Sequence, residues 1–234
     1  MNKITNLLFG LLLTIVIPVI SSLASHYITI ENNFVPGSVI THSTILILSV
    51  AAILYLKKFD FFTFPFRSVK LKHYLYGILL AFAGLIVAAI ITSIIVSISG
   101  MSLENAGNPH SGIAGKTPLQ FFLFVFLYAS ICEEFLYRGL AQNFFKPLQE
   151  IGIRINKNVF ISLPVLLCGV LFSMSHLILL TTNTGLITLI NVLIMTWIIG
   201  TIAGYFQEKH QNILPAIVIH MTANLPGLII SLFM

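Results

Sequence analysis

Long apolar stretches constrain the fold of this sequence more than any other feature. A helix that crosses a bilayer needs about 20 consecutive, mostly apolar residues, and stretches of that length recur along the chain of 234 residues. The pattern predicts an all-α fold class: a polytopic integral membrane helical bundle with about seven transmembrane helices. We expect these helices at Ile4–Leu23, Val39–Leu56, Tyr74–Ile98, Leu119–Phe145, Val159–Leu180, Leu186–Tyr205 and Leu214–Phe233.

The composition supports the same fold class. Charged residues make up 8% of the chain, whereas an ordinary soluble domain carries about 25%, and the mean hydropathy is +1.00. The 12 basic and 7 acidic residues are too few to cover the surface of a water-soluble protein of this length. The sequence therefore excludes a soluble enzyme and a nucleic-acid-binding domain, and membrane lipid is the first expected partner.

The chain reads as a single membrane domain over residues 1–234, because no internal repeat, low-complexity segment or soluble domain interrupts the apolar pattern. The first stretch, Ile4–Leu23, is longer than the usual signal-peptide core of about 7–15 residues. We therefore expect it to remain as a helix. Cys132 and Cys168 lie in apolar runs, give no disulfide framework and are expected to pack as inert small hydrophobic residues.

Basic residues predict how the bundle is oriented, because cytoplasmic loops of membrane proteins carry an excess of Lys and Arg. With the N-terminus in the cytoplasm, ten basic residues lie in the inner segments and only Lys116 lies outside. The aromatic and basic segment Lys57–Lys72 is expected to lie on the inner leaflet, and Gly100–Pro118 to form an outer connecting loop. The composition favours a bacterial plasma membrane.

Three ionisable side chains interrupt the fourth apolar stretch: Glu133, Glu134 and Arg138. A charged residue at mid-membrane costs about 2.5–3.5 kcal/mol on insertion scales, so such residues are functional candidates by default. Glu134 and Arg138 are four residues apart and share a helix face, so they can form an ion pair that lowers the cost of burial. Glu133 points about 100° away from Glu134 and needs a proton, a water or a partner from another helix.

Candidate partners for Glu133 lie on later helices. His176 is in the fifth stretch, and His220 and Asn224 share one face of the seventh. With a rise of about 1.5 Å per residue, Glu133, His176 and His220 lie roughly 18, 25 and 9 Å from the expected inner ends of their helices. These levels overlap near mid-membrane, so the four side chains are expected to surround one cavity. His42, near the start of the second stretch, is expected at the membrane interface.

This set of side chains suits amide hydrolysis inside a membrane. A buried carboxylate beside an imidazole can activate water as a general base, and a second imidazole with an amide can stabilise an oxyanion. As an alternative, Glu133, His176 and His220 are candidate zinc ligands, with a water in the remaining position. Because the sequence has no HExxH motif and His220 has an alternative role beside Asn224, we favour a reaction without a cofactor and keep zinc as the alternative.

Three motifs resemble those of the CPBP family, the CAAX prenyl protease and bacteriocin-processing group of intramembrane proteases, also called Abi or type II CAAX proteases. Glu133–Arg138 (EEFLYR) is similar to the family's EExxxR motif, Phe172–His176 (FSMSH) to its FxxxH motif, and His220–Asn224 (HMTAN) to its HxxxN motif. Their order, spacing and placement on three apolar helices all agree. The resemblance covers a catalytic core of about residues 119–234.

The resemblance implies an intramembrane endopeptidase, of a family also labelled metalloprotease, that cleaves a prenylated protein or a bacteriocin or pheromone precursor. It implies that Glu133 and His176 activate the attacking water. It also implies that His220 and Asn224 form the oxyanion site, and that Glu134 and Arg138 are supporting residues.

Other functions remain open at this point. One alternative is a non-catalytic membrane interaction protein of the same fold, for example a bacteriocin self-immunity factor or a scaffold. Another is a proton-coupled transporter that uses Glu133 and His176 as a relay, although no inverted repeat in the sequence supports it. The polar residues of the three motifs would then fix helix packing or partner binding instead of performing catalysis.

Overall fold

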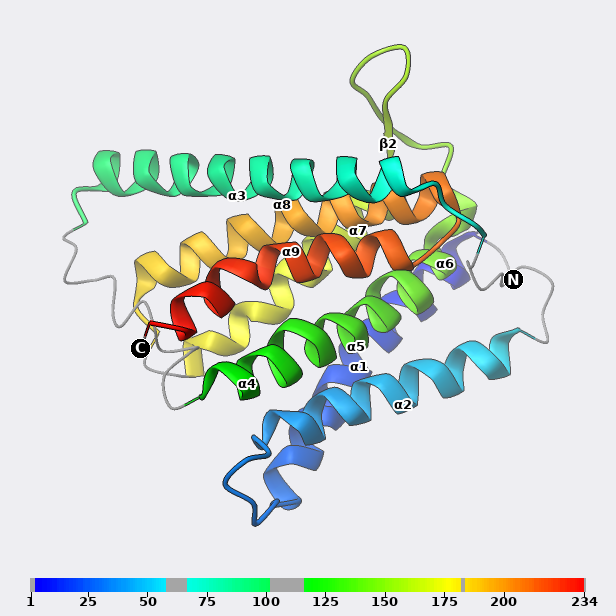
Figure 1. Ribbon diagram of the computed structural model, residues 1–234. Helices are drawn as coiled ribbons and strands as arrows, with labels where there is room; N and C mark the ends of the chain where they lie inside the picture. The colour runs from blue at the N-terminus through cyan, green and yellow to red at the C-terminus, as the bar shows by residue number, and fades with distance from the viewer. Residues whose placement is uncertain (1–2, 58–66, 102–115, 182–183, 234) are drawn as a thin grey trace.

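The computed structural model describes residues 3–57, 67–101, 116–181 and 184–233. Within these residues, seven helical segments are long and apolar enough to cross a membrane, so the prediction of an all-α polytopic bundle is confirmed (Figure 1). The expected inner-leaflet segment and outer connecting loop lie largely outside the described residues. The seven segments are α1 (Lys3–Tyr27), α2 (Ser38–Leu56), α3 (Leu71–Ser99), a composite helix over Pro118–Leu148, a second composite helix over Leu163–Thr181, α8 (Leu186–His210) and α9 (Leu214–Ser231).

The composite helix Pro118–Leu148 carries the two glutamates, and its backbone is irregular on both sides of them. It consists of α4 (Pro118–Gln120), the π-helical η2 (Phe121–Ala129), α5 (Ser130–Glu134), the π-helical η3 (Phe135–Ala141), α6 (Gln142–Phe145) and the short η4 (Lys146–Leu148). Thr117 and Gln120 form a capping box at its start. π-helical turns are rare and occur frequently at functional sites, and here they flank the one turn that holds Glu133 and Glu134.

A short antiparallel hairpin connects the two composite helices. Its strands are β1 (Gly152–Arg154) and β2 (Phe160–Ser162), paired with Gly152 opposite Ser162. α7 (Leu163–Ser175) begins directly after β2 and continues into the 3₁₀ helix η5 (His176–Thr181). The helix starts four residues later than expected because Ser162 caps it, accepting a hydrogen bond from the Val165 N–H.

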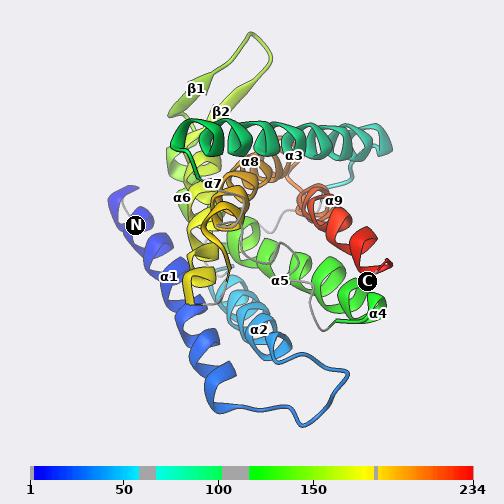
Figure 2. The same cartoon turned by 90° about the vertical axis from the view of Figure 1, so that its left-hand side faces the viewer.

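The composite helix Pro118–Leu148 lies in the middle of the bundle. Figure 2 shows α3 along one side, α1 and α2 on the opposite side and α5 between them. α5 contacts both α2 and α9, and η3 contacts α1, α2 and α7, whereas α8 packs against α3, α7 and α9. The turn with the two glutamates is therefore enclosed by helices from both halves of the chain.

Small residues allow α7 and α8 to approach closely. A Cβ atom added at Gly200 of α8 would lie 3.2 Å from the Cα atom of Gly169 on α7, the kind of close backbone contact that packs helices together in lipid. By contrast, α1 and α3 expose large apolar side chains such as Leu12 and Ile86, as expected for surfaces that face lipid. The start of α1 and the β1–β2 hairpin lie at the same end of the bundle (Figure 1).

Candidate functional site

A fully buried ion pair forms the inner part of the site. Arg138 Nη1 donates to Glu134 Oε1 at 3.0 Å, and both side chains are 0% exposed, which confirms the pairing expected from their spacing. Arg138 Nη2 also donates to the carbonyl oxygen of Gly200 on α8 at 2.8 Å. The guanidinium carbon lies 5.0 Å from the centre of the Phe172 ring, within cation–π range. The pair thus joins the composite helix to α7 and α8.

The ion pair is not fully satisfied by hydrogen bonds. Glu134 Oε2 and Arg138 Nε are buried and have no hydrogen-bond partner among the described residues. A buried ion pair whose hydrogen bonds are incomplete contributes little to the free energy of folding, and replacing such a pair by apolar residues is often neutral or stabilising. The pair is therefore better explained by the side chain that it orients than by its own contribution to stability.

That oriented side chain is His220 of α9. Its Nδ1 lies 3.0 Å from Glu134 Oε1, the same oxygen that accepts from Arg138. A carboxylate paired with arginine only accepts hydrogen bonds, so Nδ1 is the donor. Consequently Nε2 is an acceptor in the neutral imidazole and a donor only in the imidazolium form.

The free side of His220 faces the second glutamate. His220 Nε2 lies 3.8 Å from Glu133 Oε2, which is too long for a direct hydrogen bond. A water located about 2.8 Å from each atom would bridge this gap with ordinary hydrogen-bond lengths. The side chain of Glu133 is 20% exposed, whereas that of Glu134 is fully buried. Glu133 is therefore the more accessible of the two carboxylates.

The other oxygen of Glu133 contacts a residue that the sequence analysis placed elsewhere. His42 Nε2 of α2 lies 3.1 Å from Glu133 Oε1, and the His42 side chain is 17% exposed. The sequence analysis did not anticipate this contact between His42 and Glu133. α2 has 19 residues and the composite helix has 31, lengths of roughly 28 and 46 Å, so counting from helix ends gives no common depth scale. An ionisable side chain in an apolar stretch was the available signal.

His176 lies beside this centre and not in direct contact with it. Its Nδ1 approaches the carbonyl oxygen of Phe172 at 2.9 Å and Ser175 Oγ at 3.4 Å. Within the described part of the chain, no ion pair of 4.0 Å or less joins His176 to a carboxylate. The Phe172 ring is shared between the two imidazoles, with its centre 5.1 Å from that of His176 and 5.2 Å from that of His220.

Asn224 completes the set one turn beyond His220 on α9. Its Nδ2 donates to Ser130 Oγ at 3.0 Å and, over a longer distance of 3.4 Å, to the carbonyl oxygen of Val125. Both partners belong to the composite helix, so Asn224 lies at the same interface between α9 and α5 as His220. The structure thus brings residues from all three predicted motifs to one region of the bundle.

The zinc alternative requires Glu133, His176 and His220 to converge on one metal ion. Zinc holds nitrogen and oxygen ligands at about 2.0–2.2 Å, so its ligands must converge on one point. No group of three His, Cys, Asp or Glu side chains arranged to hold a metal occurs among the residues that the structure describes. Glu133 Oε1 is hydrogen-bonded to His42 and His220 Nδ1 to Glu134, whereas Glu133 Oε2 and His220 Nε2 face each other at 3.8 Å.

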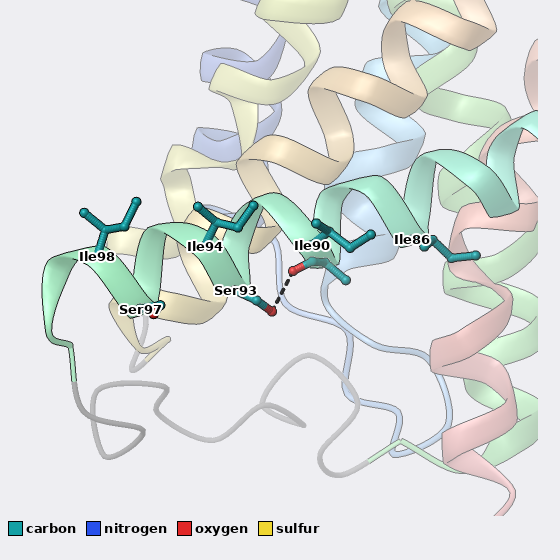
Figure 3. Close-up of a pocket in the computed structure, with 7 residues that line it drawn as sticks. Ile86, Ile90, Ser93, Ile94, Ser97 and Ile98 are labelled. Carbon is teal, nitrogen blue, oxygen red and sulfur yellow. Dashed lines mark hydrogen bonds between the residues drawn. The ribbon is translucent and has the colours of Figure 1, made fainter.

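The surface hollow shown in Figure 3 is unrelated to this site. It is lined by one helix only, α3, through Ile86, Ala89, Ile90, Ser93, Ile94, Ser97 and Ile98. The Ser93 hydroxyl is already used, donating to the Ala89 carbonyl oxygen at 2.9 Å. The hollow holds no ionisable group and is part of the apolar outer surface of the bundle.

Comparison with known families places the three motifs in one matched segment. The model of the family described as type II CAAX prenyl endopeptidase Rce1-like matches residues 115–226. No curated protein and no solved structure matches the chain. His42 precedes the matched segment, whereas the predicted site residues Glu133, Glu134, Arg138, His176, His220 and Asn224 all lie within it.

Proposed function

We propose that this chain, whose residues 115–226 match the model of the type II CAAX prenyl endopeptidase Rce1-like family, is an intramembrane endopeptidase that hydrolyses a peptide bond in a membrane-associated protein or peptide. The observation that carries the proposal is the arrangement of Glu133, with one carboxylate oxygen held by His42 and the other facing His220 across 3.8 Å. This arrangement leaves one carboxylate oxygen available to a water inside an otherwise apolar bundle.

Glu133 acts as the general base in this proposal. Its Oε2 takes a proton from a water while the water oxygen attacks the carbonyl carbon of the peptide bond. The proton then passes to the leaving amine as the carbon–nitrogen bond breaks, so the carboxylate is regenerated. His176 assists because the Phe172 carbonyl oxygen can only accept from Nδ1, which makes the neutral Nε2 an acceptor for the same water.

His220 and Asn224 stabilise the negative charge that develops on the carbonyl oxygen. Donors fixed before the reaction are worth more in a water-poor site than in solution, since they need no reorganisation. Glu134 accepts from His220 Nδ1 and so orients the imidazole, and a hydrogen on the opposite nitrogen, Nε2, donates to the oxyanion. Asn224 joins by exchanging its long contact to the Val125 carbonyl oxygen for the oxyanion.

Glu134 and Arg138 have a supporting role. They are fully buried and contact His220 and the α8 backbone instead of the accessible face of Glu133. We propose that the reaction needs no metal, since the hydrogen bonds just described already give every ionisable side chain of the site a role. The proposed substrates are prenylated proteins or bacteriocin or pheromone precursors, and the proposed orientation places the N-terminus in the cytoplasm of a bacterial cell.

The test uses the full-length protein in liposomes and two probes, a farnesylated peptide that ends in a CAAX sequence and the same peptide without the prenyl group. Mass spectrometry identifies the products. We expect cleavage of the farnesylated peptide by the wild type and loss of cleavage in Glu133→Gln, which keeps the shape of the side chain and removes the base. If the folded wild type cleaves neither peptide, the proposal is contradicted. That result is the one expected of a non-catalytic interaction protein.

A further inference from the structure

We propose that His42 is a positioning residue for Glu133, which fixes the carboxylate through Oε1 and leaves Oε2 free for the attacking water. The inference rests on the proposed function and extends it to α2, which precedes the segment that the family model matches. The contact that carries it is His42 Nε2 to Glu133 Oε1 at 3.1 Å.

Proton accounting shows what kind of contact this is. His42 Nδ1 lies 2.7 Å from the carbonyl oxygen of Ser38, and a carbonyl oxygen only accepts, so Nδ1 carries a hydrogen. An ionised Glu133 also only accepts, so Nε2 must carry a second hydrogen when the carboxylate is charged. The imidazolium then neutralises Glu133 within the bundle, which lowers the cost of holding a carboxylate there.

The hydrogen bond also fixes the geometry of the base. With Oε1 occupied by His42, the carboxylate plane is held and Oε2 is directed to the side of His220, 3.8 Å from its Nε2. A glutamate side chain without this contact would sample other rotamers, and a misplacement of about 1 Å can lower a reaction rate by about 10²-fold.

The structure ties the start of α2 to the composite helix at more than one level. Ser43, the next residue, shares a hydrogen bond of 2.7 Å with the Tyr128 hydroxyl of η2. The loop before α2 is held by the start of the composite helix, because Gln120 Nε2 donates to the carbonyl oxygens of Asn33 at 3.1 Å and Phe34 at 2.8 Å. The position of His42 beside Glu133 is therefore supported independently of the His42 side chain.

Two substitutions separate a positioning role from a packing role. In His42→Gln the terminal amide nitrogen takes approximately the place of Nε2 and can donate to Glu133. In His42→Asn it takes the place of Nδ1 and can reach only Ser38. The variants differ by one methylene group, so a general packing defect affects both, whereas loss of the Glu133 contact affects only the second.

The kinetic experiment uses the farnesylated CAAX peptide and the full-length protein in liposomes. We expect His42→Asn to lower kcat by about 10²-fold with KM changed less than about threefold, and His42→Gln to recover at least about tenfold of that loss. His26→Asn, an exposed residue at the end of α1, is the control and should match the wild type. Wild-type kcat in His42→Asn, together with an inactive Glu133→Gln, overturns the role of His42 while leaving the proposed function intact.

A second readout does not depend on the substrate. The carboxyl carbon of Glu133 in protein with 13C-labelled glutamate is assigned by its disappearance from the NMR spectrum of Glu133→Gln. We expect its chemical shift to move in His42→Asn and to remain close to the wild-type value in His42→Gln. An unchanged chemical shift in His42→Asn overturns the role of His42, whether or not the wild type cleaves a peptide. A wild type that cleaves no peptide overturns only the proposed function.

Discussion

Replacing Arg138 by methionine removes the positive charge that neutralises Glu134 and keeps most of the side-chain volume. Arg138 and Glu134 are both 0% exposed, with Nη1 and Oε1 3.0 Å apart. The variant therefore leaves a carboxylate buried with one remaining donor, His220 Nδ1. It also removes the hydrogen bond from Arg138 to the Gly200 carbonyl oxygen.

The size of the effect follows from these distances. At 3.0 Å and an effective dielectric constant of about 20, the Coulomb attraction within the pair is about 5 kcal/mol. Removing one partner of a buried pair costs about 3–5 kcal/mol in measured cases. Because the hydrogen bond from His220 Nδ1 to Glu134 remains, we expect Arg138→Met to lower the free energy of unfolding by about 3 kcal/mol, at the lower end of that range.

The double variant Glu134→Gln/Arg138→Met is the matched test, since it removes both charges at once. Reversible unfolding in mixed micelles, followed by circular dichroism, gives the free energy of each variant. We expect the double variant to be at least about 1 kcal/mol more stable than Arg138→Met, because no unpaired charge remains. Arg154→Met, on the exposed strand β1, should change stability by less than about 0.5 kcal/mol. Equal destabilisation in the single and double variants would refute the buried-charge reasoning.

Two further predictions concern packing and metal dependence. Gly200→Ala should destabilise the protein by about 1–3 kcal/mol, because the new Cβ would lie 3.0 Å from Arg138 Nη2 and 3.1 Å from Phe172 Cδ1. The control is Gly37→Ala, where no atom lies within 4 Å of the new Cβ. Equal thermal stability of the two variants would argue against close packing at Gly200. Chelator-treated protein should retain full peptide cleavage without stoichiometric metal in elemental analysis, and loss of activity that zinc restores would favour the zinc alternative.

The sequence predicted the membrane bundle and the buried pair because both depend on local patterns. Apolar length identifies a spanning helix without knowledge of its neighbours, and a spacing of four residues places Glu134 and Arg138 on one helix face. The partner of Glu134 on another helix, His220, was anticipated only as a member of the same cavity. Its contact with Glu134 in place of Glu133 depends on how α9 packs against α5, which no local pattern specifies.

His42 and His176 show where sequence reasoning stops. Depth counted from helix ends assumes straight helices that begin at a common level, but Ser43 near the start of α2 contacts Tyr128, ten residues into the composite helix. The change from α7 to the 3₁₀ helix η5 occurs at His176, so its ring is held by the preceding turn and not by Glu133. Both placements are set by the tertiary arrangement of helices and by backbone irregularity, for which apolar periodicity carries no signal.

The rate of peptide cleavage by Glu133→Gln in a single turnover decides whether Glu133 is the general base. Single-turnover conditions report the hydrolytic step without product release, and equal thermal stability of the two proteins shows that the fold is retained. We expect a rate constant for cleavage of the farnesylated CAAX peptide at least about 10³-fold below the wild-type value, since the general base is absent. A rate constant within tenfold of the wild type would contradict the assignment of Glu133 as the base.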